Sequence, residues 1–437
     1  MNTIARPRHS QPVMPPLNML GLCDIQAQLA AGHCTSTELV SACLARIAAR
    51  EQDVGAWAWL DTERALQQAQ RYDGMRPTGR HPLAGIPVGI KDVIDTLAMP
   101  TSYGSAIYAR NQPTWNAYCV AAIENAGGII LGKTTTSEFA HSAPSATRNP
   151  HGLGHTPGGS SSGSAACVAD FMVPAALATQ TGGSTIRPAA FCGIVGYKPS
   201  FGMINRSGVK LVAESLDAIG IMARTVADVQ LLAGVLTPLP SFHPARSAPR
   251  IGFYRTPYWN QVDFDCQDAL LARLQRLARH GARVSSVPDL EVLRALYQDQ
   301  RDIMNYEAAR AMLFEFQHYA DQLSDQLREN LESGWAFPRE SYTEALERAC
   351  IGRMAFARQV QDYDVLVTPS APGAAPAGLA SSGTSLFNRS WSLLGVPTLS
   401  LPNGANTDQL PLGVQLVGRL GGDAELLHWA SWIEARS

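Results

Sequence analysis

Residues 156–199 read TPGGSSSGSAACVADFMVPAALATQTGGSTIRPAAFCGIVGYKP and contain two glycine-rich turns. The first turn leads into an alanine-rich stretch, residues 164–171, whose composition favours a helix. Residues 175–180 then predict a buried strand, which runs directly into the second turn, Gly182-Gly183-Ser184. A succession of turn, helix, strand and turn is typical of an α/β protein.

The spacing of the two turns allows their serines to meet. A helix of about ten residues rises ~15 Å, and a strand of six or seven residues descends ~20 Å. The 24-residue separation of Ser160 and Ser184 can therefore bring the two side chains together. Taken alone, GGSSSGS could equally be a flexible linker.

Composition narrows the class of protein. The chain has 437 residues, 46% hydrophobic and only 16% charged, with 37 glycines and 28 prolines, which suits a large α/β enzyme with a buried core. Its net charge of −2 and the lack of a like-charge run argue against a nucleic-acid partner or a polybasic membrane anchor. Since no stretch reaches the ~18 apolar residues of a membrane span, and residues 1–16 lack the apolar centre of a signal peptide, we expect a cytoplasmic protein.

The cysteines and histidines do not suggest a metal site. Eight cysteines are scattered without a C-x-x-C pair, so we expect reduced, buried thiols. Ten histidines show no H-E-x-x-H and no paired ligand spacing. We therefore expect neither a catalytic metal nor another cofactor.

The chain reads as a single domain, residues 1–437, with several distinct stretches. Apolar residues recur at helical spacing after residue 20, and Thr35 and Glu38 form a capping-box pattern. Short apolar runs separated by glycine begin near Leu83 and indicate buried strands. The remaining expectations are a loose tail (1–18), a helix (62–72), a core that carries the chemistry (80–240), a strand (250–255), a mainly helical cap or peripheral layer (266–360), two late strands (364–372 and 396–404) and a last helix (423–435).

Several of these segments together resemble the amidase signature family over nearly the whole chain. The family pattern of two serine-bearing glycine turns is matched by GGSSSGS (158–164) and TGGS (181–184), followed by Pro188-Ala189. Other matching stretches, in order, are GIPVGIKDVID (85–95), GGIILGKTTTSEFA (127–140), SLDAIGIMARTVAD (215–228), DYDVLVTPSAP (362–372) and LPLGVQLVG (410–418). The resemblance implies an α/β fold, built on a large mixed sheet with helices on both faces, and an amidohydrolase that cleaves a C–N acyl bond.

The resemblance also implies a Ser–Ser–Lys triad. Ser184 would be the nucleophile that forms an acyl-enzyme, and Ser160, after a cis peptide bond, would pass the proton to Lys91. A lysine base must be neutral, so the pKa of Lys91 has to fall well below about 10.4. Its strand face, shared with Pro87 and Gly89, leaves room for a poorly hydrated amine. Without the resemblance, Ser160 could be a helix N-cap, and Lys91 could be a surface lysine paired with Asp95. We expect Ser161 and Ser164 to be hydrogen bonders at the start of the helix.

The second turn is also the expected oxyanion hole. Its four backbone N–H groups, those of Thr181, Gly182, Gly183 and Ser184, would donate to the oxyanion of the tetrahedral intermediate. Two positions depart from the family pattern: Gln180 stands where many members have an aspartate, and Arg187 lies one place later than the usual arginine. Charged support behind the nucleophile turn is therefore in doubt.

Two alternative functions remain. Residues 127–134 satisfy the P-loop pattern G-x-x-x-x-G-K-T, but the Ile-Ile-Leu in its middle favours a strand and residues 117–126 before it favour a helix, the reverse of a nucleotide-binding loop. The other alternative is a glutamine-dependent amidotransferase A-subunit that supplies ammonia to a tRNA-linked partner. The stretch SEFAHSAP (137–144) differs from the usual sequence of such amidotransferases.

The motifs leave the substrate open, and the oligomeric state as well. A small-molecule amide, anilide or carbamate (urethane) would fit the chemistry. Candidate pocket residues are Met99, Tyr103, Thr135 and Thr136 near the core, and Met304, Tyr306, Trp335 and Phe337 in the helical stretch. Their character suggests a medium-sized apolar or aryl substrate, although core packing explains them equally well.

Overall fold

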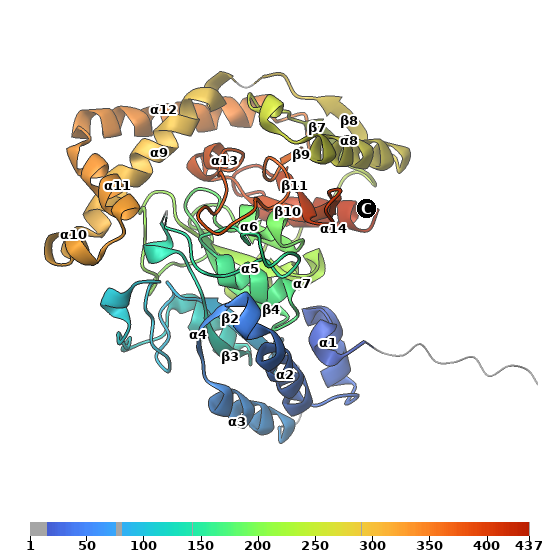
Figure 1. The fold of residues 1–437 in the computed structure, drawn as a ribbon. Coiled ribbons are helices and arrows are strands. Elements are labelled where there is room, and N and C mark those ends of the chain that lie inside the picture. Colours follow the sequence, from blue (N-terminus) through green and yellow to red (C-terminus); the bar gives the residue numbers. More distant parts are fainter. Residues whose placement is uncertain (1–14, 76–80, 142, 290, 437) are drawn as a thin grey trace, which may run out of the picture.

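The fold is that of a computed structural model, which describes residues 15–75, 81–141, 143–289 and 291–436 (Figure 1). In these residues one mixed sheet has eleven strands in the order β1-β3-β2-β4-β6-β5-β10-β11-β9-β7-β8. The strands are β1 (Trp57–Leu60), β2 (Pro87–Lys91), β3 (Ile129–Thr134), β4 (Ala175–Gln180), β5 (Val195–Lys198), β6 (Ala218–Ala223), β7 (Arg250–Phe253), β8 (Arg283–Ser286), β9 (Val365–Pro369), β10 (Thr398–Ala405) and β11 (Pro411–Val417).

Helices connect and cover these strands. The α-helices are α1 (Leu22–Ala30), α2 (Ser36–Val54), α3 (Thr62–Asp73), α4 (Tyr118–Asn125), α5 (Ser162–Ala169), α6 (Ile186–Phe191), α7 (Val226–Leu236), α8 (Phe264–Arg279), α9 (Glu291–Ala311), α10 (Leu313–His318), α11 (Asp325–Ala336), α12 (Arg339–Gln359), α13 (Arg389–Leu394) and α14 (Asp423–Glu434). Short 3-10 helices are η1 (Leu17–Met19), η2 (Ala106–Tyr108), η3 (Glu138–Ala140), η4 (Trp259–Gln261) and η5 (Ala320–Gln322).

The parallel centre of the sheet creates the place for a site. Strand β2 pairs in parallel with β3 on one side and β4 on the other. The chain therefore adds β3 on one side of β2 and then crosses back to add β4 on the other side. Right-handed crossovers put α4 and α5 on opposite faces of the sheet. Lys91 ends β2 and Gln180 ends β4. The carboxyl ends of these strands form a topological switch point, where open α/β sheets bind ligands.

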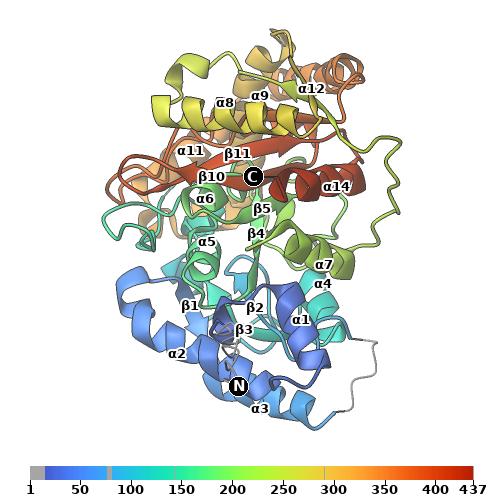
Figure 2. The ribbon, with the colours of Figure 1, turned by 90° about the vertical axis from the view of Figure 1, so that its right-hand side faces the viewer.

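Helices cover both faces of the sheet. Helix α6 contacts α5 and strands β5, β10 and β11, while α7 contacts α4, α1 and α14. Figure 2 shows these helices around the central strands. The expected α/β class, a large mixed sheet between helical layers, is confirmed.

Local sequence explains the central elements. All residues of β2, β3 and β4 are buried, as expected for near-continuous apolar runs in a sheet covered on both sides. A Cβ on Gly89 of β2 would lie 3.0 Å from Thr134 and 3.3 Å from Trp57, so only glycine fits between the neighbouring strands. The capping box of Thr35 and Glu38 is present at the start of α2.

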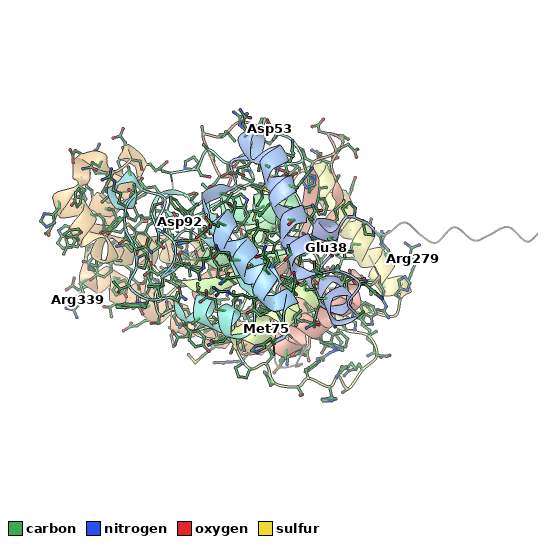
Figure 3. The ribbon with its side chains drawn as sticks, turned by 90° about the horizontal axis from the view of Figure 1, so that it is seen from below. Glu38, Asp53, Met75, Asp92, Arg279 and Arg339 are labelled. Carbon is green, nitrogen blue, oxygen red and sulfur yellow. The ribbon has the colours of Figure 1, made fainter. Side chains whose placement is uncertain are left out.

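The mainly helical stretch leaves one sheet and returns to it. Strands β7 and β9, which flank it in sequence, pair directly in parallel. Helices α9, α11 and α12 contact one another and α9 contacts α13, at the end of the molecule opposite α1–α3 (Figure 1). Seen from below, Arg339 at the start of α12 and Arg279 at the end of α8 lie on opposite sides (Figure 3).

Two expectations need correction. Strand β8 was not expected inside the helical stretch, because three of its four residues are exposed and give no apolar run. The expected tail (1–18) lies mostly outside the described residues, but Asn18 is buried in η1 and donates to the Phe171 carbonyl at 3.0 Å. As expected, in contrast, the P-loop pattern is strand β3, preceded by α4, and Lys133 within it is 0% exposed, with Nζ 3.2 Å from Asp92.

The cysteines are free, and six of the eight are buried, with Cys23 half-buried and Cys350 exposed. In the part of the chain that the structure describes, none of the helices is sufficiently long and apolar to span a membrane.

Candidate active site

Lys91 projects from the end of β2 into the protein interior. Its side chain is 0% exposed, and its Nζ lies 2.7 Å from Ser160 Oγ and 2.7 Å from Thr179 Oγ1. The alternative pairing with Asp95 is wrong, because Asp95 accepts a hydrogen bond from the Tyr103 hydroxyl at 2.9 Å and Lys91 is not at the surface. The structure thus brings two of the three predicted triad residues into direct contact.

The environment of Lys91 favours the neutral amine. Burial lowers its pKa from 10.5 to about 7, and the negative charge of Asp217 opposes this shift. Desolvation penalises the charged form of an amine, which is why burial has this sign. Near neutral pH a substantial fraction of Lys91 can therefore accept a proton.

Ser160 is held by the first glycine turn. The Gly159–Ser160 peptide bond is cis, as the resemblance implies. The Ser160 carbonyl accepts from the backbone N–H of Ser137 at 3.2 Å, and Ser160 is 2% exposed. These contacts leave its hydroxyl facing Lys91.

The other serines of this turn attach it to the sheet. Ser161 Oγ donates to the Thr179 carbonyl at 3.2 Å, and Ser164 Oγ donates to the Leu177 carbonyl at 2.9 Å. Both therefore bond strand β4 and not the start of α5, contrary to expectation. A Cβ on Gly163 would lie 2.2 Å from the Ala56 carbonyl oxygen, so the helix start approaches the neighbouring backbone as closely as glycine permits.

The second glycine turn contacts the first. Arg187 Nη2 donates to the Gly159 carbonyl at 2.6 Å, and a Cβ on Gly158 would lie 2.9 Å from Pro188 Cα. Ser184 is partly exposed while its neighbours on both sides are buried. The turn therefore presents this serine to solvent beside the Ser160 turn.

The backbone of the second turn offers free donors. The N–H groups of Thr181, Gly182, Gly183 and Ser184 donate to no acceptor among the described residues. Two of their carbonyls, by contrast, are used: Thr181 accepts from Gln300 and Gly182 accepts from Ser392. Such an arrangement can bind an oxyanion.

Gln180 supports the turn without a charge. Its Oε1 accepts from the N–H groups of Thr185 at 2.9 Å and Ile186 at 3.0 Å. Its Nε2 donates to Ser392 Oγ at 3.1 Å, and the Ser392 hydroxyl donates to the Gly182 carbonyl at 2.8 Å. The side-chain amide of Gln180 thus anchors both ends of the turn. Many members of the family have an aspartate at this position.

Asp217 is a site residue that the motifs did not reveal. It is buried, its Oδ1 accepts from the Thr181 hydroxyl, and its Oδ2 accepts from the N–H groups of Val212 at 2.7 Å and Ala213 at 3.2 Å. Burial raises its pKa to about 6, against the opposing effect of these hydrogen bonds. It lies in a stretch that matched the family, but the match assigned it no role.

Gln300 also reaches the turn. It lies on α9, is 0% exposed, and its Nε2 donates to the Thr181 carbonyl at 3.1 Å. Sequence reasoning missed it because a glutamine on an amphipathic helix carries no signal of its own. Met304, one turn later, places Sδ 3.9 Å from Gln300 Nε2 and so lies close to this contact.

The pocket residues that we expected near the core lie in different surroundings. Met99 is 1% exposed and belongs to the main hydrophobic core. Thr135 donates its N–H to the Ala56 carbonyl at 2.9 Å, and Tyr103 bonds Asp95. Thr136 Oγ1 is buried without a hydrogen-bond partner in the described part of the chain, and the next residue, Ser137, donates its N–H to the Ser160 carbonyl.

The expected pocket residues of the helical stretch mostly pack together. The Tyr306 ring stacks on Tyr342 at 4.0 Å between centroids and meets Phe337 edge-on at 6.5 Å. Trp335 is 50% exposed and lies over Arg310. Apart from Met304, these residues have contacts within α9, α11 and α12. Over the described ranges, no group of three or more His, Cys, Asp or Glu could hold a metal ion.

Comparison with known proteins finds an amidase family model and similar proteins over most of the chain. The family model described as Amidase matches residues 38–427. The A-subunit of glutamyl-tRNA(Gln) amidotransferase from Chloroflexus aggregans (strain MD-66 / DSM 9485) is 33% identical over 95% of this chain and 96% of its own. A crystal structure of an amidase is similar with 30% identity and a TM-score of 0.87, covering 95% of this chain and 100% of that one. The native peptide amidase from Stenotrophomonas maltophilia is similar with 29% identity and a TM-score of 0.82, covering 95% and 96%.

Proposed function

Because the chain belongs to the amidase signature family, we propose that it is an amidohydrolase that cleaves the C–N bond of a linear amide through an acyl-enzyme on Ser184. The observation that carries the proposal is the 2.7 Å contact of the buried Lys91 Nζ with Ser160 Oγ, beside the turn that presents Ser184. Serine–lysine arrangements of this kind perform nucleophilic catalysis without a histidine.

The proposed reaction begins with proton transfer. Neutral Lys91 takes the proton of the Ser160 hydroxyl as Ser160 takes the proton of Ser184. Ser184 Oγ attacks the acyl carbon, and the carbonyl electron pair moves to oxygen. Collapse of the tetrahedral intermediate breaks the C–N bond, and the proton returns through Ser160 to the leaving amine. Water then repeats the sequence on the ester and releases the acid, so that one amide and one water give one acid and one amine.

The free N–H groups of the second turn would stabilise the oxyanion. One such donor can contribute about 3–4 kcal/mol to the transition state. Asp217 would position Thr181 and modulate the pKa of Lys91. Gln180 would hold the turn through its side-chain amide. Anilides and carbamates can follow the same steps, because only the leaving group differs.

The test uses purified protein with primary amides, p-nitroanilides and aryl carbamates. We expect Ser184→Ala to abolish turnover and Lys91→Ala to lower kcat by several orders of magnitude with the circular dichroism spectrum preserved. Lys198→Met is the matched control, since Lys198 is also a buried lysine at the end of a strand, but its Nζ donates to the Pro199 carbonyl. A Lys91→Ala variant with near-normal rates at pH 7 would refute the relay.

A second candidate function is that of an amidotransferase A-subunit. It is favoured by the curated relatives, which carry that name at 33% and 34% identity. In that case the site would release ammonia from glutamine and need a partner protein. Glutaminase activity that appears only with such a partner would support it, whereas hydrolysis of simple amides by the isolated chain would not.

A further inference from the structure

Arg187 is a buried cation three residues after the proposed nucleophile. It is 6% exposed, and its Nη2 donates to the Gly159 carbonyl at 2.6 Å and to Ser382 Oγ at 3.2 Å. Its Nε is buried and has no hydrogen-bond partner among the described residues. One nitrogen of the guanidinium thus supports the Ser160 turn, while its Nε–H group remains available to donate a hydrogen bond.

Arg389 lies on the other side of the same turn. A Cβ on Gly182 would lie 3.8 Å from Arg389 Cγ and 3.7 Å from Ser385 Oγ, so this side chain borders the expected oxyanion hole. Its Nε donates to Ser385 Oγ at 2.9 Å, and its guanidinium lies 4.8 Å from the Tyr297 ring centroid. Its Nη1 is buried, again without a partner within the described ranges.

The positive charges of these two arginines are not neutralised. No ion pair of the described residues includes either of them. Burial lowers the pKa of Arg187 to about 9, with a further contribution from the charge of Arg389. Burial and the same charge lower the pKa of His141 to about 4. The cations are therefore close enough to repel each other.

Such an arrangement is costly unless an anion completes it. Buried charges are normally paired, and breaking a buried pair leaves a strongly unfavourable uncompensated charge. A purely structural role accounts for the bonds of Arg187 to Gly159 and Ser382. It does not account for the unused Nε of Arg187 or the unused Nη1 of Arg389, both at the nucleophile turn.

We propose that the substrate is an amide whose acyl part ends in a carboxylate, bound by Arg389 and Arg187, with no ammonium group beside it. The inference rests on the proposed function, because it assigns the substrate class of that same site. Guanidinium groups suit this task, since they present several fixed donors to a carboxylate. The neighbouring groups, Ser382, Ser385 and Gln300, are polar and uncharged.

The same charges discriminate against a zwitterion. Glutamine carries an ammonium beside its carboxylate, and that ammonium would be repelled by two cations with no acidic partner. Glutaramate is glutamine without the amino group, and glutaramide is its neutral counterpart. The three compounds share a primary amide on the same carbon chain and differ in the charged or neutral groups at its other end.

The experiment compares kcat/KM for these three compounds, with succinamate and adipamate to vary the chain length. We expect the best carboxylate-bearing amide to exceed glutaramide and glutamine by about 100-fold, the scale of one or two charge-assisted hydrogen bonds. Arg389→Gln should bring the kcat/KM ratio of glutaramate to glutaramide close to one, and Arg389→Lys should keep part of the preference. Arg328→Gln, on the surface beside Asp325, is the matched control and should change nothing.

Binding separates this inference from the proposed function. Calorimetry with glutarate should show binding to the wild type and to Ser184→Ala, and its loss in Arg389→Gln. If no amide is hydrolysed but glutarate still binds through Arg389, the amidase proposal fails and the anion subsite stands. If amides are hydrolysed without any preference for a carboxylate, or glutamine is the best substrate, the subsite proposal is overturned.

Discussion

Lys91 determines the pH at which this site can work. Because the pKa of Lys91 is lowered to about 7 and the base must be neutral, the active fraction grows as pH rises through that value. We predict that log kcat/KM for a neutral amide rises by about one for each pH unit below an apparent pKa near 7 and is level above it. A pH–rate profile from about pH 5 to pH 9 measures this. A descending limb in that range, or no inflection, would contradict the role of a neutral lysine.

Asp217 should shift that profile. Its charge raises the pKa of Lys91, opposing burial, so Asp217→Asn should move the ascending limb to lower pH. The rate on the plateau should fall as well, because Thr181 loses its charged acceptor. Asp364→Asn removes a carboxylate that pairs with Arg250 elsewhere in the molecule and should leave the limb in place. An identical limb in wild type and Asp217→Asn would show that the two groups are not coupled.

Gln180 should stabilise both the fold and the turn. Gln180→Ala leaves the buried N–H groups of Thr185 and Ile186 without an acceptor. Each such group costs about 1–3 kcal/mol, so we predict a loss of about 2–6 kcal/mol in the free energy of unfolding, together with a lower kcat. Denaturant unfolding and initial rates measure the two effects. A double-mutant cycle with Ser392→Ala should show strong coupling, and additive losses would mean that the amide does not act through Ser392.

Among the site residues, the sequence could reveal those that belong to a motif. The contact of Lys91 with Ser160 and the cis bond before Ser160 agree with the resemblance. Thr179, Asp217 and Gln300 could not be predicted, because each reaches the site through the folding of a different segment and none belongs to a spacing pattern. The departure at Gln180 was visible in the sequence, but its hydrogen bond to Ser392, more than two hundred residues away, was not.

The contact between helices α9 and α11 should influence catalysis from a distance. A Cβ on Gly334 of α11 would lie 1.9 Å from the Asn305 carbonyl of α9, so Gly334→Ala must separate the two helices. Since Gln300 on α9 bonds the Thr181 carbonyl, we predict a lower melting temperature and a lower kcat with the triad unchanged. Melting curves and initial rates test this.

A second helical glycine provides the control for that substitution. Gly234 of α7 is exposed and a Cβ there would meet nothing within 4 Å. Gly234→Ala should therefore stabilise the protein by about 0.5–1 kcal/mol and leave kcat unaffected. If Gly334→Ala proves as harmless as Gly234→Ala, the close packing of α11 on α9 is not important for the site.

Helices and strands were predictable where their apolar residues followed a periodic or continuous pattern. Strand β4 has the predicted bounds, and helices α3 and α14 differ from theirs by one residue at most. Helix α5 begins and ends two residues earlier than expected, since the glycine and serine positions of 162–163 are helical despite their composition. Strand β8 was missed because β-pairing at the edge of a sheet can hold a largely exposed, polar segment.

The whole molecule assembles the site from distant parts of the chain. Lys91, Ser160 and Ser184 come from the region of the parallel strands, whereas Gln300 and Arg389 come from the segments that follow β8 and β9. The strand order puts β6 and β5 between β4 and β10. Sequence periodicity predicts strands but not which strands become neighbours, so the contact of Gln300 with the nucleophile turn required the structure.

The central claim is that Ser184 is the nucleophile of this assembly, and covalent labelling tests it most directly. A fluorophosphonate reacts irreversibly with an activated serine, and mass spectrometry of the intact chain and its peptides locates the product. We predict one adduct per chain, on Ser184, absent in Ser184→Ala and strongly slowed in Lys91→Ala. An adduct on Ser160 or on another residue, or a folded wild-type protein that is not labelled, would contradict this account.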